Sequence, residues 1–312
     1  MIQNTFCHIL RITVATERQL WADGVTCGEQ LCQCSHPKMS PAKRRAAEIH
    51  LAESREHLQA GNPAYFADHL ASREHWRLLR DFRTTAAFVD IETTGLGSYD
   101  QFTTIALFDG RQICHYIQGR NLEQFGYDIQ QYRLLVTFNG KCFDVPFIER
   151  ALGVRLPQAH VELRYVLKAL GYSGGLKAVE KRLGMDRREL DGVDGFMAVL
   201  LWQEYRRRGD PAVLETLPAY NLHNVLNLET LMVFACNQKL QATPFHTEHA
   251  MAVDQLAGVL KHVLIRQRLG MAIIDRNLGH QTAFPRRDNA WHVSKFQVTA
   301  RTRLRRLEAR HF

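Results

Sequence analysis

Residues 86–96 read AAFVDIETTGL, and this stretch decides which fold to expect. Its apolar and β-branched beginning predicts a short buried strand over residues 86–91. Asp90 and Glu92 stand two positions apart, so their carboxylates point to the same face of the sheet, about 7 Å apart along the strand. Two acids among apolar residues are unfavourable unless a cation neutralises them. The stretch is therefore a candidate binding site, with a strand end that reaches solvent as the alternative.

Further strands follow in two arrangements. Runs of β-favouring residues over 103–108 and 111–117 are joined by an Asp-Gly pair at 109–110, which is a strong hairpin signal. An apolar strand is predicted over 134–138 and a short extended piece over 160–163, each followed by a helix. Antiparallel strands followed by strands that alternate with helices predict a mixed sheet in an α/β domain.

Helical spacing of apolar residues divides the chain into a helical N-terminal segment (1–85), an α/β domain (86–240) and a helical, basic C-terminal tail (241–312). From Arg286 to Phe312 eight basic and two acidic residues give a charge of +6, which is typical of a solvated end and less often of a phosphate-binding arm. Helices are expected over 17–22, 41–59, 68–80, 145–152, 164–170, 176–183, 196–207, 211–238 and 250–268, with the helix from 211 broken near Pro218.

The composition excludes several classes of protein. With 312 residues, 46% of them hydrophobic, and a net charge of +8, the chain is neither disordered nor fibrous. No apolar stretch approaches the roughly 20 residues of a membrane-spanning helix, and Arg11 interrupts the apolar run near the N-terminus, so neither a membrane span nor a secretory signal is expected. Seven scattered cysteines are an odd number, which favours reduced thiols and a cytoplasmic protein.

One group of potential soft metal ligands stands out, because Cys27, Cys32, Cys34 and His36 lie within ten residues. Structural zinc sites usually have about two to four residues inside each ligand pair and a long separation between the pairs. This group has neither feature. A chance cluster is therefore favoured, and a zinc-binding adaptor is the weaker alternative.

Two later stretches carry polar groups in positions typical of sites. In FNGKCFD (138–144) a strand ends, a glycine turns the chain, and Asp144 stands near the start of a helix. Loops after strands are where ligand sites collect in α/β sheets, although Asp144 is equally a candidate helix cap. In YNLHNV (220–225) Tyr220 and Asn224 lie one turn apart on one helix face, an arrangement more often found in cores and caps. The combination of the motifs carries more weight than any one of them.

Four motifs occur in order, at residues 88–96 (FVDIETTGL), 136–144 (VTFNGKCFD), 174–177 (GGLK) and 220–225 (YNLHNV). Together they resemble the YprB-like branch of the ribonuclease-H-like 3′–5′ exonucleases, in the DEDD group with a tyrosine in its third motif. The resemblance covers residues 86 to about 237. It implies a ribonuclease-H-like, mixed five-stranded sheet flanked by helices.

The resemblance also implies a role for each matching residue. Two divalent ions, Mg²⁺ or Mn²⁺, about 3.5–4 Å apart would activate a water and stabilise the leaving oxygen. Tyr220 matches the tyrosine that orients or deprotonates this water. The metal ligands are expected at Asp90, Glu92, Asp144 and Asn224, and the pocket for the terminal nucleotide at Thr93, Thr94, Leu96 and Asn139.

Two positions depart from the family's pattern. Asn224 stands where the family has an aspartate, so the site loses one negative charge, and the ion that shares this position should bind more weakly. Glu162 keeps the charge of a commonly found aspartate on a longer stem. His223 is next to Asn224 but points elsewhere on a helix, so no catalytic role is expected for it.

The start of the chain resembles the short segment that precedes the domain in related chains, which looks like a helix-hairpin-helix. The glycine-rich turn of that motif presents backbone N–H groups to phosphate. Here the turn would be residues 9–13 (ILRIT), which contain no glycine, so this copy is degenerate.

The sequence therefore predicts a metal-dependent 3′–5′ exonuclease that hydrolyses phosphodiester bonds of single-stranded or frayed nucleic acid and is weakened by Asn224. The alternative is a catalytically disabled module of the same fold, whose remaining acids and basic tail hold nucleic acid or a protein partner. Binding through phosphates would persist in chelator and fall steeply with salt, whereas cleavage would need the metal. No membrane partner is expected.

Overall fold

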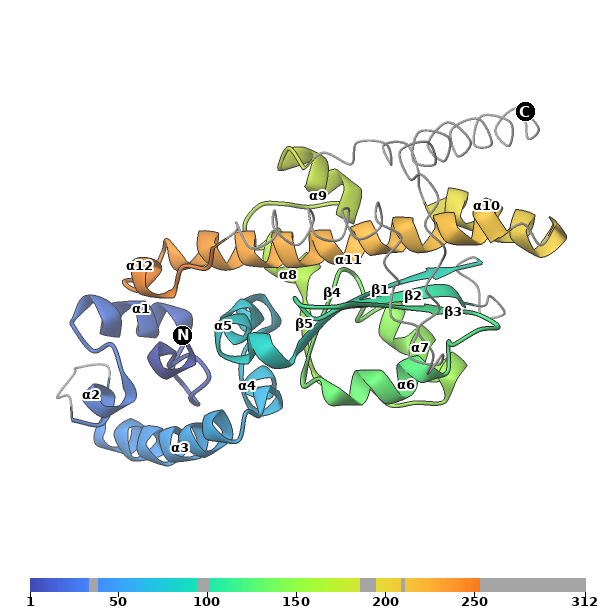
Figure 1. Cartoon of the computed structure of the whole chain (residues 1–312). Coiled ribbons are helices and arrows are strands. Elements are labelled where there is room, and N and C mark those ends of the chain that lie inside the picture. The colour runs from blue at the N-terminus through green and yellow to red at the C-terminus, as the bar shows by residue number, and fades with distance from the viewer. Residues whose placement is uncertain (34–38, 95–101, 186–194, 209–210, 253–312) are drawn as a thin grey trace.

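A mixed five-stranded sheet lies at the centre of the computed structural model (Figure 1). The structure describes residues 1–33, 39–94, 102–185, 195–208 and 211–252. In the order β3-β2-β1-β4-β5, the first three strands are antiparallel, and β4 and β5 run parallel to β1, which confirms the predicted mixed sheet. The strands are β1 (Ala86–Thr93), β2 (Phe102–Phe108), β3 (Ile113–Ile117), β4 (Leu134–Thr137) and β5 (Ala159–Glu162).

β1 is the middle strand and separates two hydrophobic cores. Side chains alternate along a strand, so Phe88, Asp90 and Glu92 share one face, and Val89 and Ile91 share the other. Phe88 belongs to the core under the long helix α11, whereas Val89 and Ile91 belong to the core on the opposite face. The two acids therefore point toward α11, as their alternation predicts.

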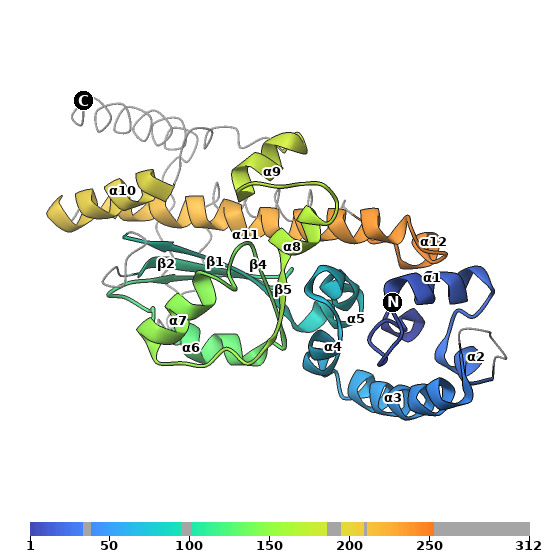
Figure 2. The same cartoon turned by 180° about the vertical axis from the view of Figure 1, so that it is seen from behind.

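Helices cover both faces of the sheet (Figures 1 and 2). α10 (Gly195–Arg208) and α11 (Pro211–Leu240) lie over one face, and α6 (Gln124–Asp128) and α7 (Asp144–Leu152) lie over the other. A short 3₁₀ helix, η4 (Ile129–Gln131), follows α6. α8 (Leu163–Lys168) and α9 (Leu176–Arg182) come after β5. The α11 residues buried in the core with Phe88 include Leu222, Val225, Leu228 and Leu231.

The N-terminal segment is helical, and it packs beside the end of α11 that carries α12 (His246–His249) (Figure 1). The helix predicted over 250–268 falls almost wholly outside the described residues. No helix in the described part of the chain is long and apolar enough to cross a bilayer. The N-terminal elements are η1 (Ile2–Asn4), α1 (Val14–Ala22), α2 (Gly28–Gln33), α3 (Pro41–Gln59), α4 (Pro63–His69), η2 (Ser72–Arg77), α5 (Leu78–Phe82) and η3 (Arg83–Thr85).

The single helix expected over 68–80 is wrong. Three short helices, α4, η2 and α5, occupy this region, with the chain extended at Leu70 (ψ 141°). The ring of His75 contacts the carbonyl oxygens of Ala67 and Leu70 at 3.0 Å each. Carbonyls at a helix end need partners, and here an imidazole provides them in place of a further helical turn.

The break expected near Pro218 is also wrong, because α11 is helical over all 30 residues from Pro211 to Leu240. A proline inside a helix removes one backbone hydrogen bond and its ring crowds the carbonyl of the preceding turn, which together cost about 3 kcal/mol. The part of α11 that follows residue 221 is buried against the sheet. This packing stabilises the helix by more than the proline destabilises it.

The N-terminal turn departs from a helix-hairpin-helix by more than its missing glycine. In place of a first helix, Ile2–Asn4 form a three-residue 3₁₀ helix. Arg11 adopts a φ of 68°, the left-handed conformation that glycine adopts without strain. The expected turn thus has the backbone conformation of a glycine turn but presents an exposed arginine side chain.

A buried ion network joins the N-terminal residues to η2. The Arg77 side chain is 2% exposed and pairs with Glu17 at 2.7 Å and with Glu74 at 3.1 Å. Its guanidinium lies 5.5 Å from the ring centroid of Trp21 and 5.1 Å from that of Trp76. Each charge therefore has a partner within a region closed to water.

We predict that Arg77→Met lowers the free energy of unfolding by about 3–5 kcal/mol, because it leaves two carboxylates buried without their cation. Urea unfolding followed by circular dichroism measures the loss. Arg207→Met is the matched control, since Arg207 is 60% exposed and pairs with Glu204 on the surface of α10. An exposed pair contributes about 1 kcal/mol or less. Equal losses in the two variants would contradict a stabilising role for the buried network.

Candidate functional site

Acidic side chains from neighbouring strands meet at one edge of the sheet. β1, β4 and β5 are parallel, so their carboxyl ends lie at the same edge. Glu92 stands near the end of β1, Asp144 begins the helix after β4, and Glu162 ends β5. All three are buried, with exposed fractions of 8%, 6% and 1%. The strand register shifts between Glu92 and Thr93, which marks an irregularity in β1 beside the acids.

The pKa of Asp144 reflects its burial and the charges around it. Burial raises its pKa well above the ordinary value of an aspartate, and the charges of Asp90, Glu162 and Glu92 raise it further. We call these four residues the acid cluster. The N-cap of α7 is Phe143, so Asp144 is not the residue that caps the helix. Helix capping therefore does not explain the position of Asp144, whereas Glu162 is the N-cap of α8 and accepts from the backbone N–H of Arg164.

Glu162 holds the loop after β4. Its carboxylate accepts hydrogen bonds from the backbone N–H groups of Asn139 (2.7 Å), Lys141 (3.1 Å) and Arg164 (3.1 Å). Asn139 has a φ of 68°, and its Oδ1 accepts a 2.6 Å hydrogen bond from Arg164 Nη1. Both carboxylate oxygens of Glu162 thus accept backbone hydrogen bonds. Glu162 thereby fixes the position of Asn139 beside the site.

Two asparagines of α11 bind the carboxylate of Asp90. Asn221 Nδ2 donates to Asp90 Oδ2 at 2.7 Å, and Asn224 Nδ2 donates to the same oxygen at 3.0 Å. An ionised carboxylate only accepts hydrogen bonds, so both amides turn their NH₂ groups toward it. Asn224, which was predicted as a metal ligand, therefore lies against Asp90 as a hydrogen-bond donor.

Asn221 is a site residue that sequence reasoning missed. It is fully buried, and its Oδ1 has no hydrogen-bond partner. Its spacing from Asn224 was the available signal, because residues three apart lie on neighbouring positions of a helix surface. The sequence does not tell which turn of the helix faces the strand, so the signal was not specific.

The neighbouring face of α11 makes a separate contact. Asn227 Nδ2 donates to Glu180 Oε1 of α9 at 2.8 Å and lies 3.0 Å from His223 Nε2. Glu180 is buried. His223 therefore bonds within this second group, away from Asp90, as its helical position predicts.

The remaining predicted residues fall into three groups. Thr93 is buried and Thr94 half-buried at the end of β1, next to Glu92. Tyr220 lies on α11, one turn before Asn224. Leu96 falls outside the described residues.

The chemistry of the acid cluster fits a divalent ion. Carboxylate oxygens are the ligands that Mg²⁺ and Mn²⁺ prefer, and a cation would relieve the repulsion that, in addition to burial, raises the pKa of Asp144. The unpartnered Oδ1 of Asn221 is one further oxygen donor. Among the described residues, no three Asp, Glu, His or Cys side chains converge closely enough to hold an ion as they stand. Binding would therefore require the carboxylates to turn toward the ion.

Two of the four residues in the cysteine cluster are described. Cys27 and Cys32 are both half-buried. Cys34 and His36 fall outside the described residues. The chance cluster therefore stays a prediction, with the zinc site as its alternative.

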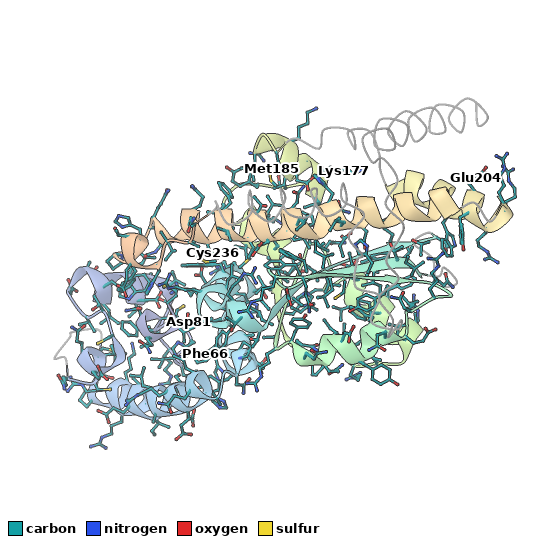
Figure 3. The ribbon with its side chains drawn as sticks, viewed as in Figure 1. Phe66, Asp81, Lys177, Met185, Glu204 and Cys236 are labelled. Carbon is teal, nitrogen blue, oxygen red and sulfur yellow. The ribbon has the colours of Figure 1, made fainter. Side chains whose placement is uncertain are left out.

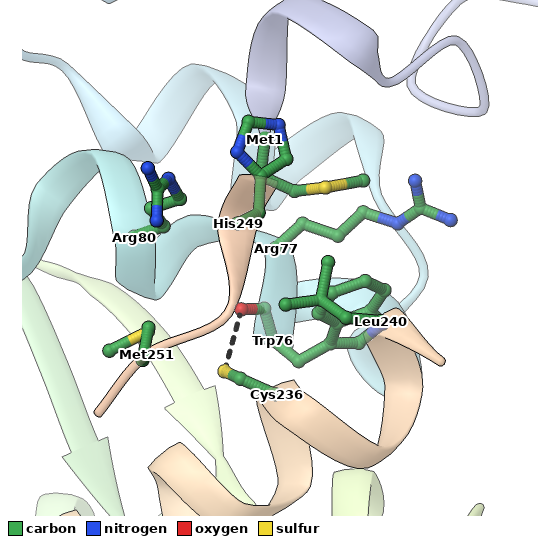
Figure 4. Close-up of a pocket in the computed structure, with 8 residues that line it drawn as sticks. All are labelled: Met1, Trp76, Arg77, Arg80, Cys236, Leu240, His249 and Met251. Atoms are coloured by element: carbon green, nitrogen blue, oxygen red, sulfur yellow. Dashed lines mark hydrogen bonds between the residues drawn. The ribbon is translucent and has the colours of Figure 1, made fainter. Parts of the chain in front are cut away.

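A small pocket lies near the other end of α11 (Figure 4). Cys236 is twelve residues after Asn224 and about 18 Å further along the helix. Its thiol donates to the carbonyl of Trp76 at 3.3 Å, and Figure 3 shows it on the part of α11 that faces the N-terminal helices. The pocket is a gap between α11 and the N-terminal segment, remote from the acids. Its lining residues are Met1, Trp76, Arg77, Arg80, Cys236, Leu240, His249 and Met251.

Part of this chain is similar to known proteins. Residues 87–236 match a family model described as the RNase_H superfamily. The family B DNA polymerase from the hyperthermophilic archaeon Pyrobaculum calidifontis is 20% identical, with a TM-score of 0.37 over 60% of this chain and 29% of the polymerase. A nuclease in its apo form is 19% identical, with a TM-score of 0.35 over 66% of this chain and 93% of the nuclease. No curated protein matches the chain.

We predict that Asn224→Asp makes stability depend on a divalent ion. In EDTA the variant lacks the hydrogen bond that Asn224 donates to Asp90 and has a second carboxylate beside it. The free energy of unfolding therefore falls by about 1–3 kcal/mol. Mn²⁺ then raises the melting temperature of the variant more than that of the unaltered protein, because an ion that binds only the folded state stabilises it. Thermal unfolding with Mn²⁺ or EDTA measures both effects.

Asn237→Asp is the matched control, because it lies on the same helix and also replaces an amide that donates a hydrogen bond, here to the backbone carbonyl of Met251 and remote from the acid cluster. It should lose stability in EDTA and show no additional response to Mn²⁺. The same response in both variants would mean that Asp90 and residue 224 do not share an ion site.

Proposed function

We propose, on the premise that residues 87–236 form a domain of the RNase H superfamily, that the chain is a metal-dependent 3′–5′ exonuclease acting on single-stranded or frayed nucleic acid. The acid cluster is the observation that carries the proposal. Four carboxylates gather where β1, β4 and β5 end, and burial together with their mutual repulsion raises the pKa of Asp144. Such a gathering of hard oxygen ligands favours a divalent cation and, with it, a phosphodiester substrate.

Asp90, Glu92 and Asp144 would hold Mg²⁺ or Mn²⁺, with Asn224 as a weaker, neutral fourth ligand. When bound, a divalent ion supplies a nucleophilic water at neutral pH and stabilises charge on the phosphate. Two amide hydrogen bonds to Asp90 Oδ2, from Asn221 and Asn224, hold this carboxylate in position.

The other predicted residues would act on the substrate. Tyr220, one helical turn from Asn224, would orient the attacking water. Thr93, Thr94, Leu96 and Asn139 would contact the terminal nucleotide. Glu162 keeps Asn139 in its left-handed conformation through the backbone N–H of that residue, so its contribution is positional.

A catalytically disabled module is the second candidate, and one observation favours it. Asn221 and Asn224 already satisfy Asp90 Oδ2 with two neutral donors. A site whose key carboxylate has such partners is stable without an ion. In this case the domain would bind nucleic acid or a protein and cut nothing.

We predict that the unaltered protein shortens a 5′-labelled single strand from its 3′ end in Mg²⁺ or Mn²⁺ and not in EDTA. Asp90→Ala and Asp144→Asn should each reduce the rate by about 100-fold or more, since each removes several kcal/mol of metal-dependent stabilisation. Asp68→Asn, at an exposed position of α4, is the charge-matched control and should cut at the normal rate. A time course on denaturing gels measures all four proteins.

The variant Asn224→Asp separates the two candidates. Cleavage by this variant alone would identify the protein as a disabled relative with an intact site. Full activity in both Asp90→Ala and Asp144→Asn would refute the proposed exonuclease site.

A further inference from the structure

A second, basic surface borders the acid cluster. It consists of the loop after β4 and the exposed side of α8. We propose, resting on the nuclease function above, that Lys141, Arg164, Tyr165 and Lys168 form a substrate rim, which binds a single strand of nucleic acid beside the acid cluster and stacks one unpaired base on the ring of Tyr165.

The substrate rim is held in place by its own contacts. Glu162 accepts hydrogen bonds from the backbone N–H groups of both Lys141 and Arg164, so one carboxylate joins the loop to α8. Arg164 Nη1 also donates to Asn139 Oδ1. The thiol of Cys142, in the same loop, interacts with the Tyr165 hydroxyl and raises the pKa of this tyrosine. A surface fixed in this way loses little freedom when a ligand binds.

The rim lies next to the acids. Its loop ends where α7 begins with Asp144, only three residues after Lys141. Glu162, which anchors the rim, is itself a member of the acid cluster. A strand that rests on the rim is therefore adjacent to the carboxylates.

In this part of the molecule the acidic side chains lie inside and basic side chains lie on the surface. Residues 139–185 are all described, and none of their acidic side chains is exposed, since Asp144, Glu162 and Glu180 are buried and Glu149 is half-buried. Arg164 and Lys168 are exposed, one helical turn apart on α8. Exposed basic side chains bind the phosphates of a nucleic acid and displace its counterions, whatever the base sequence.

Tyr165 adds the feature that selects a single strand. It is 38% exposed, which is unusual for a large side chain in the described residues. Proteins that bind single strands combine a basic path with aromatic rings on which bases stack. A base inside a duplex is already stacked and paired, so the ring favours unpaired strands.

The test is fluorescence anisotropy of a 5′-labelled oligothymidylate in EDTA, where metal-dependent cleavage is absent. Tyr165→Ala should weaken binding by about 5- to 100-fold, the range for the loss of one base–aromatic stack. Tyr165→Phe keeps the ring and loses the contact with Cys142, so its affinity should stay within about twofold. Arg164→Gln should lower the slope of log affinity against log salt by about 1.

Matched controls exist on other parts of the surface. Tyr127 is 74% exposed on α6, which lies across the sheet from α11 (Figure 1). Tyr127→Ala and Arg155→Gln, at an exposed position before β5, should bind as the unaltered protein does. Equal losses at Tyr127 and Tyr165, unchanged binding in Tyr165→Ala, or tighter binding of blunt duplex than of single strand would each overturn the substrate rim.

Failure of the rim and failure of the nuclease give different results. If the protein cuts in Mg²⁺ and Tyr165→Ala cuts with unchanged KM, the rim is wrong and the nuclease stands. If single strands bind, Tyr165→Ala binds them weakly and no metal supports cleavage, the rim stands and the exonuclease is wrong.

Discussion

The contact of Asp90 with Asn221 and Asn224 is the constraint that joins the central strand to the helix covering it. Apolar packing alone brings α11 onto the sheet through Phe88 and its neighbours, but it does not fix how the helix is rotated. The two amides do, because each must direct its NH₂ group at one carboxylate oxygen. The same contacts give the half-buried carboxylate of Asp90 two hydrogen-bond donors from the helix.

The four acids differ in how much of their charge the fold itself satisfies. Asp90 has two amide donors, and Glu162 has three backbone N–H groups. The environment of Asp144 disfavours its negative charge, because burial and its three acidic neighbours raise its pKa. The site is therefore stable as folded and still electrostatically unfavourable at one position. An aspartate at 224 would remove a hydrogen-bond donor and add a negative charge. The asparagine therefore favours stability in the absence of a cation, whereas an aspartate would favour cation binding.

The patterns that are local in sequence predicted the fold well. Alternation along β1 placed Asp90 and Glu92 on one face, and the Asp-Gly pair predicted the β2–β3 hairpin. The family match over residues 87–236 confirms the resemblance based on four motifs. The errors arose where individual side-chain contacts decide. His75 ends a helix by reaching the carbonyls of an earlier turn, and Asn221 enters the site only because of the rotation of α11. The spacing of Asn221 from Asn224 indicates a shared helix surface, but spacing alone does not predict either contact.

The separation of charge also explains why a metal and a basic rim would have different tasks. A phosphodiester is an anion and is repelled by a cluster of carboxylates, so basic side chains at the surface can hold a strand but cannot by themselves bring a phosphate among the acids. A divalent ion between phosphate and carboxylates turns this repulsion into attraction. Under the proposed function, affinity for the strand would depend on Arg164, Lys168 and Tyr165, whereas chemistry would depend on the ion. A weaker ion site at Asn224 would then leave strand binding unchanged, because no rim residue contributes a carboxylate.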